Sequence, residues 1–156
     1  MDPLPITEPM FVGKFRHTMD VKNRVTIPAP WRQKELDKFF SIPNLKDGFL
    51  MVLPPGAMRR VVDKVEDDGS LKPKARQKFI RQFFSRAQSL VVDKAGRMVI
   101  PAEQCSQLQL RGEVMLVGNN HRIEVWNLES WAGWERASEQ EEEGPGFDEV
   151  CDSLGI

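Results

Sequence analysis

The chain has 156 residues, of which 40% are hydrophobic and 29% charged, a composition that indicates a globular protein and excludes an intrinsically disordered one. It has no apolar run near the roughly 20 residues that span a bilayer. Its first ten residues lack the basic start and apolar core of a signal peptide, so we expect a cytoplasmic protein with no membrane partner. Residues 137–156 carry a charge of −7 and the rest of the chain +6, a division found in polyanion-binding proteins and in others as well.

The remaining composition argues against catalysis. Two cysteines, Cys105 and Cys151, cannot make a disulfide scaffold, and His17 and His121 lie too far from them in sequence to suggest a metal site. No serine stands in a nucleophile pattern, no glycine-rich phosphate loop occurs, and no pair of carboxylates recurs at an informative position. We expect no enzyme activity, no metal, no cofactor and no small-molecule substrate.

The chain opens with a proline-containing segment, residues 1–9, that we expect to be a flexible arm. Residues 11–19 alternate apolar and polar side chains, which predicts a strand with a basic face. Residues 20–23 predict a turn, in which Asn23 tolerates a positive φ. The return strand is predicted over residues 24–27.

Proline 28 ends this strand because proline cannot donate to a sheet. We expect a short helix over residues 31–39, then strands at 39–42 and 49–53. A closing helix is predicted from apolar residues at i, i+3, i+4 and i+7, which are Met58, Val61, Val62 and Val65. Together these elements define a first unit, residues 10–66.

A helical insert with one apolar and one basic face, residues 67–86, separates this unit from a second one, residues 87–137. The second unit repeats the first at an offset of 73 residues, so that Asp20, Arg24 and Pro28 recur as Asp93, Arg97 and Pro101. We expect its helix at 103–110, its strands at 114–117 and 123–126, and a last helix capped by Asn127.

The acidic tail, residues 138–156, is expected to be disordered. Strands as short as those of the two units cannot bury both faces alone, and interleaving the two copies would supply the missing pairings. The predicted fold class is therefore α+β, with two pseudo-equivalent, β-rich units interleaved into one body.

The repeated Asp-x-x-x-Arg turn is the strongest candidate for function. A short aspartate accepts hydrogen bonds from turn amides and can hold the arginine that follows it. The arginine is then presented rigidly, and its planar guanidinium suits phosphate oxygens and guanine edges. The alternative is that Asp20–Arg24 and Asp93–Arg97 are salt bridges that only staple two hairpins.

The flanks of the two turns differ in charge. Positions 14, 16 and 22 are basic, whereas the matching positions 87, 89 and 95 hold alanine, serine and alanine. Arg32 adds positive charge near the first copy. This difference favours the first turn as a binding surface and the second as a supporting one.

The chain resembles the MraZ family. The resemblance is carried by FVGKF at residues 11–15, DVKNRVTIPA at 20–29, DKAGR at 93–97, VMLVG at 114–118 and IEVW at 123–126. It covers residues 10 to about 136 and includes the spacing of the two turns and the helical insert. Asn23 departs from the glycine more usual in the first turn, and the arm and the acidic tail lie outside the resemblance.

The resemblance implies a bacterial, nucleoid-associated transcription regulator built from AbrB-like swapped-hairpin units. Such regulators form ring-shaped homo-oligomers and bind direct repeats in double-stranded DNA upstream of a cell-division and cell-wall gene cluster; a repressor is expected. The candidate DNA-binding residues are Arg24, Lys22, Arg97, Lys94, Arg16 and Lys14, and the candidate loop-shaping residues are Asp20, Asp93, Asn23 and Gly96. A second hypothesis is an AbrB-like, antitoxin-type protein-interaction module in which the turns are only structural.

Overall fold

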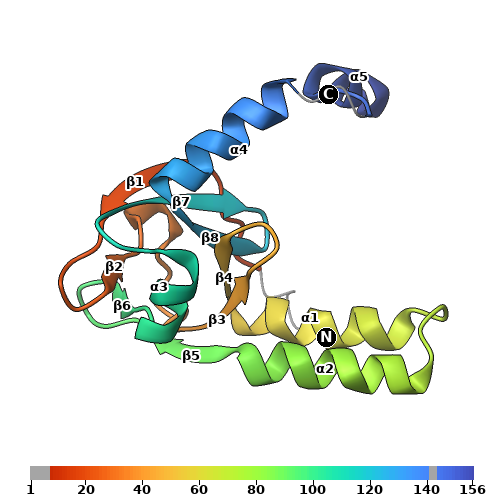
Figure 1. The fold of residues 1–156 in the computed structure, drawn as a ribbon, viewed down its shortest axis with the longest axis horizontal. Coiled ribbons are helices and arrows are strands. Elements are labelled where there is room, and N and C mark those ends of the chain that lie inside the picture. The colour runs from red at the N-terminus through yellow and green to blue at the C-terminus, as the bar shows by residue number, and fades with distance from the viewer. Residues whose placement is uncertain (1–7, 141–143) are drawn as a thin grey trace, which may run out of the picture.

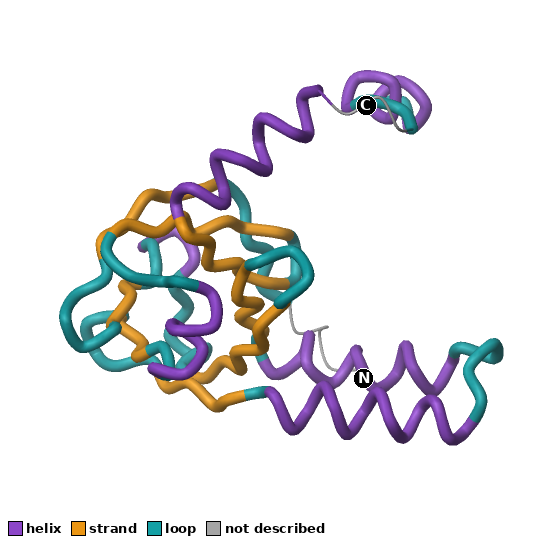
Figure 2. Tube along the Cα trace, viewed as in Figure 1, coloured by secondary structure: helices purple, strands orange, loops and turns teal. Residues whose placement is uncertain are grey.

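The computed structural model describes residues 8–140 and 144–156. The strands are β1 (Lys14–Thr18), β2 (Arg24–Thr26), β3 (Lys38–Asn44), β4 (Phe49–Leu53), β5 (Gln88–Val91), β6 (Arg97–Val99), β7 (Glu113–Asn119) and β8 (Arg122–Asn127). The helices are α1 (Pro55–Asp67), α2 (Pro73–Arg86), α3 (Ala102–Leu108), α4 (Leu128–Gln140) and α5 (Phe147–Leu154). Figure 1 shows a strand-rich body from which α1 and α2 project on one side and α4 on another, and Figure 2 separates the strands from the helices.

The strands form a six-stranded antiparallel sheet, in the order β1-β7-β8-β4-β3-β5, and a two-stranded ribbon, β2-β6. Apart from the hairpins β3–β4 and β7–β8, each pairing joins a strand of one repeat to a strand of the other. β1 pairs with β7 as β5 pairs with β3, and β4 pairs with β8. The predicted interleaving and the α+β class are confirmed.

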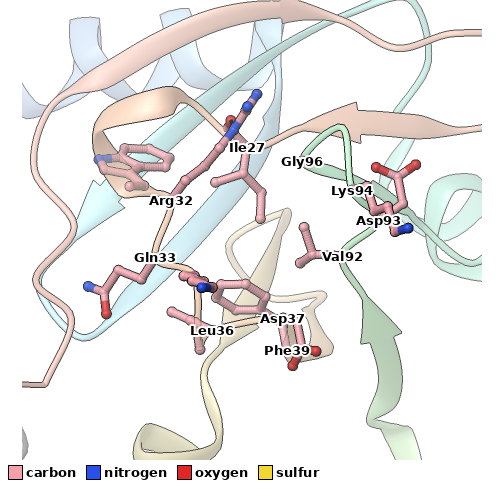
Figure 3. A pocket seen from close by; sticks show the side chains of 12 residues that line it. Ile27, Arg32, Gln33, Leu36, Asp37, Phe39, Val92, Asp93, Lys94 and Gly96 are labelled. Carbon is pink, nitrogen blue, oxygen red and sulfur yellow. Dashed lines mark hydrogen bonds between the residues drawn. The ribbon is translucent and has the colours of Figure 1, made fainter.

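The two repeats differ in the connection that follows the ribbon. After β6 the chain forms α3, as expected, whereas the helix expected over residues 31–39 is wrong: only a 3-10 turn, Ala29–Trp31, is formed before β3. Contacts with distant parts of the chain explain why the helix does not form. Trp31 is 4% exposed and its indole Nε1 donates to the Val12 carbonyl at 2.8 Å, while Phe39 belongs to β3 opposite Leu90. Arg32, directly after the turn, lines a hollow together with Gly96 of the second repeat (Figure 3).

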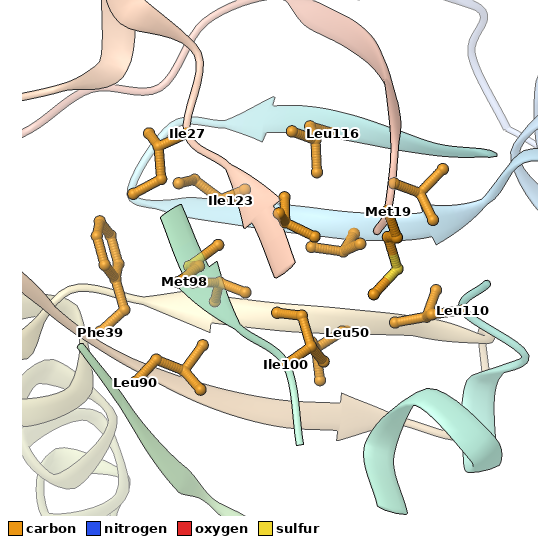
Figure 4. Packing of buried hydrophobic residues seen from close by; sticks show 14 of the residues in the cluster. Met19, Ile27, Phe39, Leu50, Leu90, Met98, Ile100, Leu110, Leu116 and Ile123 are labelled. Atoms are coloured by element: carbon orange, nitrogen blue, oxygen red, sulfur yellow. The ribbon is translucent and has the colours of Figure 1, made fainter. Parts of the chain in front are cut away.

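The core lies between the ribbon and the six-stranded sheet. Val25 of β2 and Met98 of β6 are fully buried and belong to the same core cluster. Figure 4 shows Met98 in this cluster together with Leu50, Ile100 and Leu116. The ribbon is thus held on its inner side by apolar packing. Its outer side is left for solvent.

One buried polar contact ties α3 to the sheet. The Ser41 hydroxyl donates to Gln104 Oε1 at 2.6 Å, and Gln104 Nε2 donates to the Ser41 carbonyl at 3.0 Å. Both side chains are almost inaccessible to solvent. Their mutual bonding satisfies polar groups that would otherwise be costly to bury.

The helical insert forms an antiparallel pair with α1 (Figure 1). Phe83 of α2 packs against a small cluster of Ile42, Leu53 and Met58. No residue of α2 is buried, and Phe79 and Phe84 remain 41% and 37% exposed. α2 therefore presents apolar side chains that the described residues do not cover.

The C-terminal part contains two helices. α4 begins as predicted at Asn127, whose Oδ1 accepts from the backbone amides of Glu129 and Ser130. The tail, for which no regular structure was expected, forms α5, which ends at Gly155 in a left-handed conformation. α5 has an amphipathic pattern, with Phe147, Val150 and Leu154 on one side, and that period favours a helix despite the acidic composition.

Two expectations fall partly outside the described residues: the flexible arm over residues 1–9, and the part of the tail at 141–143. No helix in the described ranges combines the length and the apolar character that crossing a bilayer requires.

Candidate nucleic-acid interface

The first repeated turn, loop 1 (residues 20–24), is organised by one carboxylate. Asp20 Oδ1 accepts from the backbone amides of Lys22 and Arg24, both at 2.9 Å. Asp20 Oδ2 accepts from Arg24 Nε at 2.5 Å. Asn23 has a φ of 59°, the left-handed conformation that asparagine tolerates. The aspartate therefore fixes both the bend and the start of the arginine side chain.

The second turn, loop 2 (residues 93–97), repeats this arrangement. Asp93 Oδ1 accepts from the amides of Ala95 and Arg97, both at 2.9 Å, and Asp93 Oδ2 accepts from Arg97 Nε at 3.0 Å. Gly96 occupies the left-handed position, with a φ of 81°. Two segments with different flanking residues thus form the same turn.

The ribbon brings the two loops together. The Ile27 amide donates to the Gly96 carbonyl at 2.8 Å, and the Ile100 amide donates to the Asn23 carbonyl at 2.9 Å. Figure 1 shows β2 and β6 at the end of the body away from the helical pair α1–α2. Each loop is therefore anchored by the strand that follows the other.

Both arginines lie on the outer face of this ribbon. Arg24 pairs with Val99 and Thr26 with Arg97, while the Val25–Met98 pair between them is buried. Successive side chains of a strand alternate between faces. Arg24 and Arg97 therefore share the face opposite the core.

The guanidinium groups are fixed by hydrogen bonds but remain accessible to solvent. The Arg24 and Arg97 side chains are 29% and 40% exposed. In the described part of the chain each hydrogen-bonds its aspartate through Nε, which leaves the two terminal nitrogens of each group without a protein partner. The salt bridges anticipated as staples are present, and they use only one edge of each guanidinium.

The electrostatics of the loops follow from these bonds. The backbone amide of Arg24 is the largest cause that holds the pKa of Asp20 below its usual range, and Arg97 acts in the same way on the pKa of Asp93. Both carboxylates therefore stay ionised at neutral pH and remain acceptors. Lys22 and Lys94 are exposed beside them and carry further positive charge at the two loop tips.

His17, next to loop 1, is part of the support. Its Nε2 accepts from the Thr26 amide at 3.2 Å, which joins β1 to β2. Partial burial lowers the pKa of His17 below its usual value, with the Asp20 charge opposing the shift. The imidazole therefore acts as a neutral acceptor.

Lys14 and Arg16, also predicted from the sequence, point elsewhere. Arg16 makes two hydrogen bonds to Glu113 of β7, at 3.1 and 2.5 Å. Lys14 bonds Glu135 of α4 at 2.7 Å and lies 5.7 Å from the centre of the Trp131 ring. Both cations are compensated by carboxylates of the second repeat, so they do not add free charge to loop 1.

Arg32 contacts loop 2, although it follows loop 1 in the sequence. The sequence placed its charge near the first copy, but its side chain lies over Gly96 in loop 2. The one sequence signal for this contact is the difference between the loops, with asparagine at position 23 and glycine at position 96. The flanking charges that favoured loop 1 as the binding surface are therefore not all at loop 1: two are paired with carboxylates, and a third lies at loop 2.

The described residues contain no cluster of His, Cys, Asp or Glu that could hold a metal ion. The terminal guanidinium nitrogens of Arg24 and Arg97 instead lie on the outer face of the ribbon with no hydrogen-bond acceptor among the described residues. Free guanidinium donors of this kind are suited to anions.

Comparison with known proteins relates this geometry to a family. A family profile described as "MraZ protein, putative antitoxin-like" matches residues 83–145. The chain is 37% identical over 145 residues to the transcriptional regulator MraZ of Pediococcus pentosaceus, covering 93% of this chain and 96% of the relative. It is 33% identical over 129 residues to the protein of the same name from Clostridium acetobutylicum, covering 83% and 89%, and 35% identical over 130 residues to that of Desulfitobacterium hafniense, covering 83% and 90%. The chain belongs to the MraZ family.

Proposed function

We propose that this protein is a sequence-specific DNA-binding transcription regulator that acts on direct repeats upstream of a cell-division and cell-wall gene cluster. The observation that carries the proposal is the pair of loops that hold Arg24 and Arg97 on one outer face, each with its terminal nitrogens free. The relatives are named transcriptional regulators, and membership of this family confirms the expectation that the chain is not an enzyme.

The geometry suits DNA for a physical reason. A guanidinium with two free terminal nitrogens can donate to a phosphate or, in the major groove, to the O6 and N7 atoms of guanine. Anchoring Nε in advance reduces the side-chain entropy lost on binding. A two-stranded ribbon is also narrow enough to enter the major groove.

One ribbon supplies few contacts, and phosphate contacts weaken steeply with salt. A ring of several copies would place several ribbons along one DNA, and the linked sites would bind more tightly without new contacts. The exposed Phe79 and Phe84 of α2 support such self-association. Action as a repressor in the cytoplasm, at the nucleoid, belongs to the same proposal.

Gel-shift measurements of the purified protein across a salt series provide the test. The probes are a duplex from the region upstream of the protein's own gene and a shuffled duplex of equal length and composition. We expect tighter binding to the upstream duplex, with multiple shifted bands if several repeats are occupied. Equal affinity for both probes at near-physiological salt would contradict the proposed sequence specificity.

A second function, an antitoxin-type protein-interaction module, is favoured by the description of the matching family profile and by the apolar side chains on α2. In that case the loops are only structural and a partner protein covers α2. The gene neighbourhood distinguishes the two functions. A small toxin gene beside this one favours the module, and a methyltransferase gene with peptidoglycan genes favours the regulator.

A further inference from the structure

Loop 2 has a neighbour that comes from the other repeat, Arg32. The Arg32 Nε donates to the Ile27 carbonyl at 2.7 Å, and the Ile27 amide donates to the Gly96 carbonyl at 2.8 Å. A Cβ atom at Gly96 would lie 2.5 Å from both Cζ and Nε of Arg32. The guanidinium therefore lies directly over Gly96, which is buried although it belongs to a loop.

This arginine is anchored in the same way as Arg24 and Arg97, but to a neutral group. In the described part of the chain its side-chain hydrogen bond runs through Nε, so the terminal nitrogens are free. Arg24 and Arg97 each share their charge with a carboxylate. Arg32 is bound to a backbone carbonyl and keeps its full positive charge.

The surroundings favour an anion. Arg32, Lys34 and Lys94 line a hollow of about 450 Å³ next to loop 2, together with Asp37 and Asp93 (Figure 3). The Asp93 carboxylate is already occupied by Arg97 and by two backbone amides. The positive groups therefore exceed the free negative ones.

We propose that Arg32 is a third arginine of the interface and binds a backbone phosphate beside loop 2. This inference rests on the proposed DNA-binding function. Phosphate contacts fix the position of a protein on the duplex without reading sequence. Because this contact exists at loop 2 only, the two loops of one chain make different contacts with DNA. Such unequal contacts suit a direct repeat better than a palindrome.

Gly96 has a second role in this arrangement. Asparagine can adopt its φ, as Asn23 does in loop 1, so the turn itself does not require glycine. Space for Arg32 does. Gly96→Asn should therefore keep loop 2 folded while displacing the Arg32 guanidinium.

The test compares the full chain with Arg32→Gln, Gly96→Asn, their double variant and Arg59→Gln, which removes an exposed arginine of α1, away from the ribbon. Binding is measured by fluorescence anisotropy on the labelled upstream duplex and on the shuffled duplex, across a salt series, with melting temperatures as the control for folding. We expect Arg32→Gln to weaken binding about tenfold on both duplexes and to lower the slope of log affinity against log salt by about 1. Gly96→Asn should act alike, and the double variant should bind no more weakly than either single variant. Arg59→Gln should keep the affinity within about twofold.

Each other outcome decides a different question. If the wild type binds and Arg32→Gln keeps its affinity and salt slope, with or without a lower melting temperature, Arg32 is structural and the inference is wrong, while the proposed function stands. If Arg32→Gln does not fold, Gly96→Asn decides the question: it must weaken binding on both duplexes and lower the salt slope, and an unchanged affinity and slope would overturn the inference. If the wild type binds neither duplex, the proposed function fails and the inference fails with it.

Discussion

At the scale of single residues, the chain uses one aspartate in each loop to shape a turn and to orient an arginine. The same carboxylate oxygen that accepts two backbone amides fixes the turn, and the other accepts Nε. Aspartate has the short side chain that hydrogen-bonds backbone amides within its own turn. The sequence predicted this local chemistry because all of its bonds lie within five residues.

What the sequence could not predict is where distant side chains meet the loops. Arg32 crosses to loop 2, and Arg16 is captured by Glu113, because the two repeats are interleaved. Such contacts depend on strand pairings between positions about 65 to 100 apart in the chain. Charge counted along the sequence does not show these contacts.

His17 predicts how stability depends on pH. Its folded-state pKa is lowered below the ordinary value of 6.5, so the unfolded chain binds the proton more readily. The stabilisation is fully present above the unfolded-state pKa of 6.5 and is lost as the pH falls through the lower, folded-state pKa. Thermal melting between pH 7.5 and 5 should show a falling melting temperature.

The matched control is His17→Gln, which keeps an acceptor near the Thr26 amide but does not titrate. Its melting temperature should fall less than that of the wild type over the same pH range. Parallel curves for the two proteins would show that His17 is not the titrating group.

At the scale of elements, the ribbon β2–β6 is a two-sided structure whose sides have different functions. Met98 is 1% exposed and faces the core, while the adjacent Val99 is 55% exposed on the side of the arginines. We expect Met98→Ala to lower the free energy of unfolding by about 2–5 kcal/mol because it opens a cavity. Val99→Ala should change it by less than about 0.5 kcal/mol.

Chemical denaturation of both variants measures this difference. Similar losses for Met98→Ala and Val99→Ala would contradict the assignment of an inner and an outer face. Because the two residues are neighbours in one strand, their positions in the backbone are nearly matched.

The elements themselves were predictable where their signal is local. The hairpin strands, the helices α1 and α3 and the cap at Asn127 follow from periodicity, proline positions and side-chain capping. The helix expected over residues 31–39 did not form, because Trp31 is drawn into the core and Phe39 is taken up by β3. There, tertiary packing overrides helix propensity.

At the scale of the whole molecule, two repeats whose strands pair with each other share one core. The interleaved pairings leave two outer features, the face with Arg24 and Arg97 and the uncovered side chains of α2. The repeat in the sequence predicted the first feature. The second lies in the helical insert, which occurs once in the chain.

The acidic tail predicts an effect on DNA binding at this scale. A tethered segment of negative charge competes with DNA for the outer face of the ribbon, which carries Arg24 and Arg97. Truncation after Gln140, which retains α4, should strengthen binding to the shuffled duplex by several-fold at low salt and change its salt dependence. Anisotropy across a salt series measures both quantities.

A full-length variant in which the acidic residues of 141–156 are replaced by Gln and Asn is the control for tail length. It should behave like the truncation. If both variants keep the affinity and the salt slope of the wild type, the tail does not compete with DNA.

The most direct test of the account is the DNA affinity of Arg24→Ala, Arg97→Ala and the double variant, measured on the upstream duplex across a salt series, with the size of the assembly checked by sedimentation. Both side chains are anchored at the surface, so the assembly should be unchanged. We expect each substitution to weaken binding by roughly tenfold or more and to lower the salt slope by about 1, and the double variant to lose the preference for the upstream sequence. Unchanged affinity and slope in the double variant, with the assembly intact, would show that the two loops only staple the fold.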